Sequence, residues 1–406
     1  MVAVDLRHHM MLPLRNGVGD LPALGFGTLI PDERAAGGGV ETALETGFRY
    51  FDCAERYCNE RVVGDALARV LARGAVKRKD VFVTTKLWNN NHRPERVSRA
   101  FEASRQRLRL DYIDLYLIHT PFAFAPGSDQ DPRDADGKVI YDNVPLLDTW
   151  RALEQLVDGG RCKAIGLSDV SLDQLEFVCE NGRIKPAVVQ IESHPYLPQR
   201  EFFEYCHGTG TVFLAFASLG HGISPRLLDD PEVTGIANRV KKSAAPVLLA
   251  WGVQRGAAVL TSSATPKRIK EDFDISSLPD DAMRPLDDQI GTRHRFNPVV
   301  DTGIPGFIPR ERQFSQQCRP RSSRELNCVP SLSPHLGTRC CSRSDHSSLL
   351  SSARERPAHS WPADSPARKG VTGIEPNRIQ FREARAARGH DARWRGRDRQ
   401  ARRLPL

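Results

Sequence analysis

The stretch Gly47-Phe48-Arg49-Tyr50-Phe51-Asp52-Cys53-Ala54-Glu55-Arg56-Tyr57-Cys58-Asn59-Glu60 decides the fold, because it combines a helix end, a buried strand, a loop and a helix start. Gly47 ends the preceding helix, since glycine tolerates the left-handed conformation that a helix stop requires. The aromatic run after it predicts a short buried strand that finishes at Asp52. Tyr57 follows in the loop, and Asn59 is expected to cap the next helix. A carboxylate therefore ends a strand, and a tyrosine lies on the loop beyond it.

Two later strands also end on polar side chains. The apolar run that starts at Val81 leads into Lys86, and the run that starts at Ile113 leads into His119. The carboxyl ends of the strands form the face on which the active sites of (β/α)8 barrels are built. We therefore expect Asp52, Lys86 and His119 to lie together with Tyr57 at one site.

Three motifs in this order resemble those of the aldo-keto reductase family. They are Gly47 to Glu60, Thr85-Lys86-Leu87-Trp88, and Leu110 to Pro121 with the ending Leu117-Ile118-His119-Thr120-Pro121. The resemblance extends from about Leu14 to about Arg312. It implies an α/β fold, a (β/α)8 TIM barrel with an N-terminal hairpin, and a cytoplasmic oxidoreductase that uses NAD(P)H.

The rest of the chain alternates between strand-like and helix-like segments. Such alternation favours a parallel sheet, and about eight strands without a complete dinucleotide-binding glycine loop favour a closed barrel. Apolar strands are expected near Val81, Ile113, Ala164, Val188, Val212 and Ala258. Amphipathic helices are expected at Glu60 to Leu71, Pro94 to Leu108, Leu147 to Val157, Leu172 to Cys179, Glu201 to Tyr205, and Glu232 to Lys241.

A hairpin is expected before the first barrel strand. Met11 to Arg15 and Leu21 to Leu24 form its arms, and Asn16-Gly17 is typical of a tight turn. The resemblance puts this hairpin over the bottom of the barrel. Near the other end, Pro285 interrupts a helical pattern, so we expect the helix either to start at Leu286 or to be weakened there.

The charge of the chain divides near residue 312. Residues 314–406 hold 19 of the 58 Lys and Arg but only 8 of the 50 Asp and Glu, so the remainder is slightly acidic. We predict a barrel over residues 1–312 and an Arg- and Ser-rich, disordered tail over 313–406. The tail is either a basic interaction segment, which could bind RNA or DNA, or an unselected segment such as read-through beyond a gene's normal end. We favour the second interpretation.

Composition excludes several other classes of function for the barrel. Its near-neutral charge gives no reason to expect nucleic acid or a membrane surface as a partner. Five of the nine cysteines precede Phe314 without a paired spacing, so we expect reduced thiols and no metal site. The N-terminus has neither a signal-peptide pattern nor a transmembrane segment. By the family default, the protein is expected to be a monomer.

Carbonyl reduction needs a hydride donor, a proton donor and a group that steadies the developing alkoxide. A free tyrosine titrates near 10, and an adjacent ammonium is expected to lower that pKa. By the resemblance, Tyr57 is the general acid, Lys86 tunes it, Asp52 anchors Lys86, and His119 orients the substrate. Trp88 is expected to form a wall of the substrate pocket together with His119.

The cofactor-binding residues also follow from the resemblance. Ser168 and Gln190 match positions that hold the nicotinamide carboxamide, whereas Asp169 replaces an Asn and at neutral pH is expected only to accept hydrogen bonds. Phe216 stands where the family usually has a stacking Tyr, and keeps the aromatic face. The remaining candidates are Gly27, Thr28, Asp52, Ala217, Ser218, Leu219, Ser262, Ser263, Arg268, Glu271 and Asp272.

The cofactor is expected to be NADPH, with NADH possible. Ser262 replaces the phosphate-binding lysine of the family, whereas Ser263 and Arg268 can still contact a 2′-phosphate. The expected reaction is reduction of aldehydes or ketones to alcohols. The alternative is a nucleotide-binding barrel with a regulatory or scaffolding role and little turnover. The loop from Pro121 to Asn143 and the segment from Asn297 to Pro309, with Phe296, Ile304 and Phe307, are expected to shape the substrate pocket.

Overall fold

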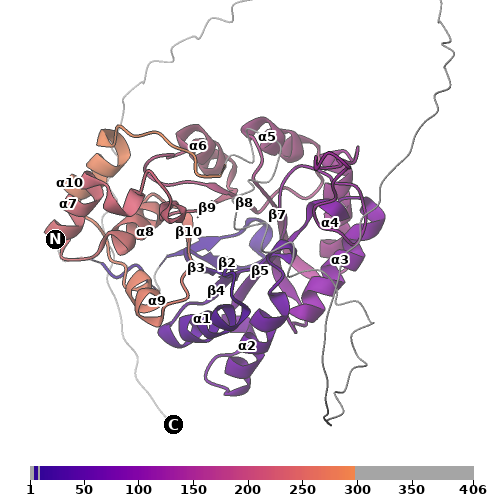
Figure 1. Ribbon diagram of the computed structural model, residues 1–406, viewed down its shortest axis with the longest axis horizontal. Helices are drawn as coiled ribbons and strands as arrows, with labels where there is room; N and C mark the ends of the chain where they lie inside the picture. The colour runs from indigo at the N-terminus through magenta and orange to yellow at the C-terminus, as the bar shows by residue number, and fades with distance from the viewer. Residues whose placement is uncertain (1–3, 8–9, 298–406) are drawn as a thin grey trace, which may run out of the picture. The chain divides into compact units, whose positions relative to one another are not determined.

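Parallel strands close into a barrel in the computed structural model, which describes residues 4–7 and 10–297 (Figure 1). Within these residues eight strands form the barrel in the order β10-β3-β4-β5-β6-β7-β8-β9, and β9 pairs with β10 to close it. The predicted (β/α)8 architecture is therefore confirmed. The strands are β3 Leu24–Gly27, β4 Tyr50–Asp52, β5 Phe82–Leu87, β6 Ile113–Ile118, β7 Cys162–Ser168, β8 Val188–Glu192, β9 Val212–Phe216 and β10 Ala258–Thr261.

Helices connect the strands and pack around the outside of the barrel (Figure 1). Limits were expected for six of them, and α2, α3, α4, α5 and α7 begin and end within about two residues of those limits, whereas α6 extends four residues beyond the expected Tyr205. The helices are α1 Glu33–Thr46, α2 Glu60–Ala72, α3 Pro94–Arg107, α4 Leu146–Asp158, α5 Leu172–Asn181, α6 Arg200–Thr209, α7 Pro231–Val240, α8 Ala244–Gln254, α9 Pro266–Phe273 and α10 Asp280–Arg284.

The motif that begins at Gly47 folds as the sequence indicates, with one exception. Gly47 has φ 128° and its N–H donates to Ala43 O, so it ends α1 as expected. Asn59 precedes α2, but its side chain does not cap that helix. Its amide instead donates to Thr28 O at 2.7 Å, a contact between β3 and the start of α2. The expectation of a capping side chain was wrong: the hydrogen bond to Thr28 O holds the side chain away from the helix, and Oδ1, the atom that would cap, has no hydrogen-bond partner among the described residues.

The hairpin closes the bottom of the barrel, as expected. Its strands are β1 Met11–Pro13 and β2 Asp20–Pro22, joined through the 3-10 turn η1 Arg15–Gly17. Leu14 and Leu21 are buried in one apolar cluster with residues at the starts of the barrel strands. That cluster also includes Tyr50, Phe82, Val188, Val212 and Ala258. Leu24 belongs to β3 and not to the hairpin.

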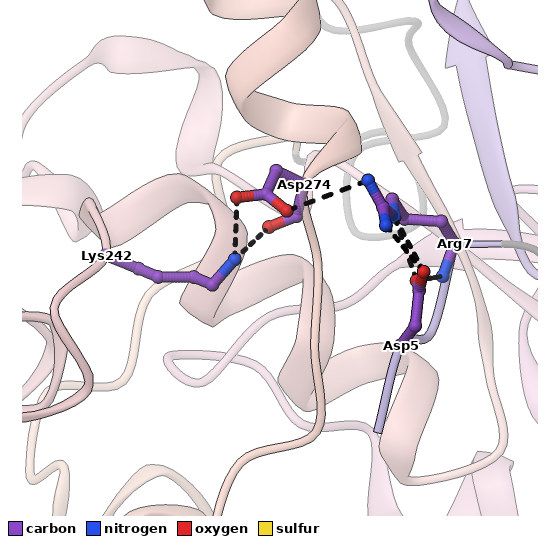
Figure 2. Close-up of polar contacts among 4 residues, drawn as sticks. All are labelled: Asp5, Arg7, Lys242 and Asp274. Carbon is purple, nitrogen blue, oxygen red and sulfur yellow. Dashed lines mark hydrogen bonds and ion pairs between the residues drawn. The ribbon is translucent and has the colours of Figure 1, made fainter. Parts of the chain in front are cut away.

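The described N-terminal residues lie against the segment that follows α9. Leu6 is buried, and its N–H donates to Ile275 O at 3.3 Å. Figure 2 shows Asp274 between Lys242, whose Nζ lies 2.8 Å from its carboxylate, and Arg7, at 4.0 Å. Arg7 also contacts Asp5 at 2.6 Å. Exposed ion pairs stabilise a fold by only about 0–1 kcal/mol each, so the burial of Leu6 and the backbone contact matter more here.

The chain beyond α9 changes helix type at proline. α10 ends at Arg284, and Pro285–Gln289 (η7) continues as a π-helical turn, which agrees with an interrupted helix at Pro285. The predicted boundary at residue 312 and the tail over 313–406 lie outside the described residues. No helix within the described ranges is long and apolar enough to cross a membrane.

Candidate active site

The four predicted catalytic side chains meet at the carboxyl ends of neighbouring strands. Asp52 ends β4, Lys86 lies in β5, His119 follows β6, and Tyr57 ends the 3-10 turn η2 (Glu55–Tyr57). Lys86 Nζ donates to Asp52 Oδ1, to Cys53 O at 3.0 Å and to Tyr57 Oη at 3.1 Å. The rings of Tyr57 and His119 are 5.7 Å apart. A chain of contacts thus runs from a buried carboxylate to a phenol and reaches a histidine.

Burial, and not the ammonium, sets the direction of the Tyr57 pKa. Burial raises the pKa of Tyr57 to about 12, although Lys86 acts to lower it. The expectation of a net decrease was wrong, since desolvation of the phenolate outweighs the attraction of Lys86. For Lys86, burial acts to lower the pKa, but Asp52 and Tyr57 together raise it above its usual value. At neutral pH the phenol therefore keeps its proton and the lysine keeps its charge.

His119 is neutral in this environment. Burial, together with the positive charges of Lys86 and Arg56, holds the pKa of His119 well below its usual value. Its Nδ1 has no hydrogen-bond partner among the described residues. The indole of Trp88 lies edge-on to His119 at 5.0 Å and is only 3% exposed. The imidazole is thus a neutral group beside an aromatic wall, and its other nitrogen, Nε2, makes no hydrogen bond within the described residues.

Both oxygens of the Asp52 carboxylate are occupied. Oδ2 accepts from Gln190 Nε2 at 2.7 Å, whereas Oδ1 accepts from Lys86. The backbone is fixed as well, because Thr28 donates to Asp52 O through its N–H and through Oγ1, each at 2.9 Å. Gly27 pairs with Asp52 in the sheet register. The predicted cofactor residues Gly27, Thr28 and Gln190 therefore all lie at Asp52, the first two along its backbone and the third at its carboxylate.

Ser168 and Asp169 lie at the end of β7, and both are buried. Asp169 has φ 50°, a left-handed conformation in which Asn and Asp are enriched. No hydrogen bond to its carboxyl group occurs within the described residues. Burial, followed by repulsion from Glu192, raises the pKa of Asp169 to about 8. The expectation that this side chain only accepts hydrogen bonds at neutral pH was wrong, because most of it keeps a proton there and can donate.

The ends of β9 and β10 contain the other predicted cofactor residues. Phe216 ends β9 partly buried and is followed by Ala217, Ser218 and Leu219, with φ 53° at Ala217. Ser262 and Ser263 follow β10, and Arg268 is exposed on α9. Ser262 is also exposed, whereas Ser263 and Glu271 are partly buried.

Asp272 behaves differently from an ordinary surface carboxyl group. It is 4% exposed, and its Oδ2 accepts from Thr261 Oγ1 at 2.6 Å. Burial raises the pKa of Asp272 to about 6, although the hydrogen bond to Thr261 acts in the opposite direction. Asp272 therefore joins α9 to the end of β10.

Comparison with known proteins agrees with this geometry. Residues 23–290 match the model of the Aldo/keto reductase family. The chain belongs to the aldo-keto reductase family. It is 41% identical over 294 residues to Aldo-keto reductase family 1 member A1-A of Danio rerio, covering 70% of this chain and 90% of that protein. It is 42% identical over 283 residues to prostaglandin F synthase 1 of Bos taurus, covering 66% of this chain and 87% of that protein.

A solved structure gives the same assignment. The aldose reductase from Schistosoma japonicum is 40% identical, with a TM-score of 0.69, and the match covers 73% of this chain and 97% of that one. This aldo-keto reductase is therefore an oxidoreductase that acts on carbonyl groups. Its family generally uses NAD(P)H as the cofactor.

Two contacts of this aldo-keto reductase connect the long loop after β6 with the site. Arg56 pairs with Asp131 at 2.6 Å in a buried ion pair, and Trp88 Nε1 donates to Gln130 O at 2.8 Å. The carboxylate of Glu55 accepts from Trp88 N at 3.2 Å. None of these contacts was expected from the sequence, because their partners are 75, 42 and 33 positions apart in the chain.

A second buried carboxylate holds the last described segment of this aldo-keto reductase. Glu192 ends β8 and accepts from His194 Nε2 at 2.8 Å, Phe296 N at 2.6 Å and Asn297 N at 2.7 Å. Phe296 is 4% exposed, with its ring 4.9 Å from that of His194. It packs in the hydrophobic core beside His194 and Tyr196, whereas Ile304 and Phe307, the other residues expected to shape the pocket, lie outside the described residues. The strand spacing could have indicated Glu192, since it lies two residues after Gln190 on the same strand.

Proposed function

We propose that this aldo-keto reductase reduces aldehydes or ketones to alcohols with NADPH, and that Tyr57 donates the proton. The observation that carries the proposal is the 3.1 Å contact between Lys86 Nζ and Tyr57 Oη next to the ring of His119. A small-molecule carbonyl group that accepts hydrogen bonds from Tyr57 and His119 would have its oxygen beside the proton donor.

The charges of the site fit this role. Tyr57 keeps its proton until a stronger base forms beside it, and an alkoxide is such a base. Lys86 stays positive and stabilises the phenolate left behind, while Asp52 keeps Lys86 in place with a carboxylate that has no free oxygen. His119 is neutral, so it can hydrogen-bond the substrate oxygen without adding a charge. Preorganised groups of this kind lower the barrier because they need no rearrangement during the reaction.

The residues at the strand ends suit a nicotinamide nucleotide. The buried carboxyl group of Asp169 has no partner among the described residues; Ser168 precedes it at the end of β7, and the partly buried Phe216 ends β9. We assign the carboxamide to Ser168, Asp169 and Gln190, and stacking to Phe216. When bound, the cofactor supplies the hydride. We assign its 2′-phosphate to Arg268, Ser262 and Ser263, because Arg268 is exposed and forms no ion pair within the described residues.

The test compares the full-length protein with its Tyr57→Phe variant. NADPH oxidation is followed with an aromatic aldehyde, and NADPH binding is measured separately by fluorescence. Loss of a positioned general acid lowers the rate by about 10²- to 10⁴-fold. We expect that loss in Tyr57→Phe with NADPH affinity unchanged. Tight NADPH binding by the wild type without turnover across a broad panel of carbonyl compounds would instead refute the proposed reaction.

A further inference from the structure

A cavity of about 660 Å³ lies outside the candidate active site, between α2, α3, the turn η4 (Asn89–Asn91) and the loop after β6. Its volume falls in the range of about 300–1,000 Å³ that small-molecule sites occupy. Four arginines line it, namely Arg61 on α2 and Arg96, Arg99 and Arg107 on α3. Glu55 is the acidic residue among its lining residues.

The three arginines of α3 share one face of that helix. Positions 96, 99 and 107 are separated by three and eight residues, which brings their side chains onto one stripe, with Ala100 and Ala103 between them. Ala100 and Ala103 line the cavity with short side chains. The arginine stripe can be found in the sequence, but from the sequence alone it is interpreted as a solvated helix face. The structure adds the loop after β6, which lines the cavity beside it.

Most of this positive charge has no close carboxylate partner among the described residues. Arg96 donates to two neutral oxygens, Asn91 Oδ1 and Gly127 O, each at 3.1 Å. Arg99 is exposed, and within the described residues it makes neither a hydrogen bond nor an ion pair. Arg61 is 3.8 Å or more from its nearest carboxylates. Only Arg107 is firmly paired, with Glu60 at 2.7 Å.

The acidic residue of the cavity does not cancel this charge. Glu55 directs its two carboxylate oxygens to Trp88 N and to Asn91 Nδ2, at 3.2 and 2.8 Å. Burial, followed by repulsion from Glu60, raises the pKa of Glu55 above its usual value. An anion that enters the cavity therefore meets several guanidinium groups and one carboxylate that is already hydrogen-bonded elsewhere.

We propose that this cavity binds a small anion that carries two or more phosphate groups. Guanidinium groups present paired N–H donors that match phosphate oxygens, and Arg61, Arg96 and Arg99 lie on two different walls of the cavity. A single phosphate would use only part of this set. An anion with several phosphate groups can contact both walls at once. Its phosphates would pair with the arginines that have no close carboxylate partner among the described residues.

The proposed site is separate from the residues assigned to the cofactor. α9, with Arg268, packs beside α1, and α1 packs beside α2, which carries Arg61, so α1 lies between the two groups of residues (Figure 1). The cavity does share contacts with the active site, because Glu55 joins its wall to Trp88, and the side chain of Gln130 donates to Glu55 O at 3.3 Å. This inference goes beyond the proposed reductase activity and does not depend on it.

The test uses inorganic pyrophosphate as the probe and isothermal titration calorimetry on the full-length protein. Saturating NADPH is present throughout, so that pyrophosphate cannot occupy the cofactor's own phosphate site. We expect saturable binding of one pyrophosphate per chain at 150 mM salt. Arg99→Gln should weaken it at least about tenfold, as expected for the loss of a charge-assisted hydrogen bond, and the double variant Arg96→Gln/Arg99→Gln should abolish it.

The matched control is Arg151→Gln, which removes an exposed arginine of α4 whose ion pair within the described part of the chain is with Asp148. It changes the net charge of the protein by the same amount, and pyrophosphate affinity should stay the same. Absence of saturable binding would overturn the proposal. So would equal weakening by Arg151→Gln and Arg99→Gln, since that result would mean attraction to the net charge alone. Competition between pyrophosphate and NADPH would place the anion in the cofactor site and overturn it too.

Discussion

The substitution Asp169→Asn tests the protonation of a buried carboxyl group. Asp169 is 6% exposed and occupies a left-handed conformation that Asn also tolerates, so the variant keeps the backbone and the shape of the side chain. The substitution removes only the titratable carboxyl group. We expect the variant to be more stable than the wild type at neutral pH and its stability to depend less on pH.

The magnitude follows from the difference between the folded and unfolded pKa values. The pKa of Asp169 is about 8 in the folded protein, against 3.8 for the free side chain. Between these values the folded protein holds a proton that the unfolded chain releases, so stability falls as pH rises from about 4 to about 8. Each pKa unit corresponds to about 1.4 kcal/mol, so the raised pKa of Asp169 lowers the free energy of unfolding at pH 7 by up to about 4 kcal/mol. The Asn variant does not titrate and avoids this loss.

The measurement is urea unfolding of the wild type and the variant at pH 5, 7 and 9. We expect the stability difference between them to grow with pH up to about 8 and then to level off. Asp111→Asn is the control, because Asp111 is exposed and outside the site. NADPH affinity should also decrease in the wild type as pH rises through 8, but not in Asp169→Asn. If Asp169→Asn and Asp111→Asn gave the same stability at every pH, Asp169 would be ionised in the folded protein and our account of it would be wrong.

Three further substitutions test packing and cofactor choice. A Cβ atom at Gly166 would lie 2.2 Å from Val188 O, so Gly166→Ala should lower the free energy of unfolding by roughly 3 kcal/mol or more, measured with urea. Gly38→Ala is the contrasting case: nothing lies within 4 Å of its Cβ, so it should stabilise α1 by about 0.5–1 kcal/mol. Ser262→Lys adds a cation beside Arg268 and should tighten NADPH binding about tenfold with little effect on NADH. Equal changes for both cofactors would contradict the phosphate assignment.

The sequence was sufficient for the barrel and for the meeting of the four candidate catalytic residues. Strands and helices alternate with clear periodicity, and parallel strands bring their carboxyl ends to one face whatever the details of packing. Asp52, Lys86 and His119 each end a recognisable strand. Their proximity therefore follows from the order of strands and helices along the chain, which hydrophobic periodicity predicts well.

The sequence was insufficient where tertiary neighbours decide the outcome. Asn59 is a good capping residue, yet Thr28 O draws its amide away from the helix. Lys86 does act to lower the pKa of Tyr57, but the extent of burial, which reverses the net direction, is a property of the whole site. The ion pair between Arg56 and Asp131 joins segments with no common local pattern.

The hairpin at the bottom of the barrel has a consequence for the order of folding. Leu14 and Leu21 are among the first residues made, yet the cluster that buries them ends with Ala258 and Leu260 of β10. The contacts of this hairpin are therefore among the most distant in the sequence. Because of that separation, the hairpin cannot reach its final packing until nearly the whole barrel has been synthesised. Shortening the N-terminus through this hairpin should therefore weaken the barrel as a whole, since it uncovers the interior at every strand start.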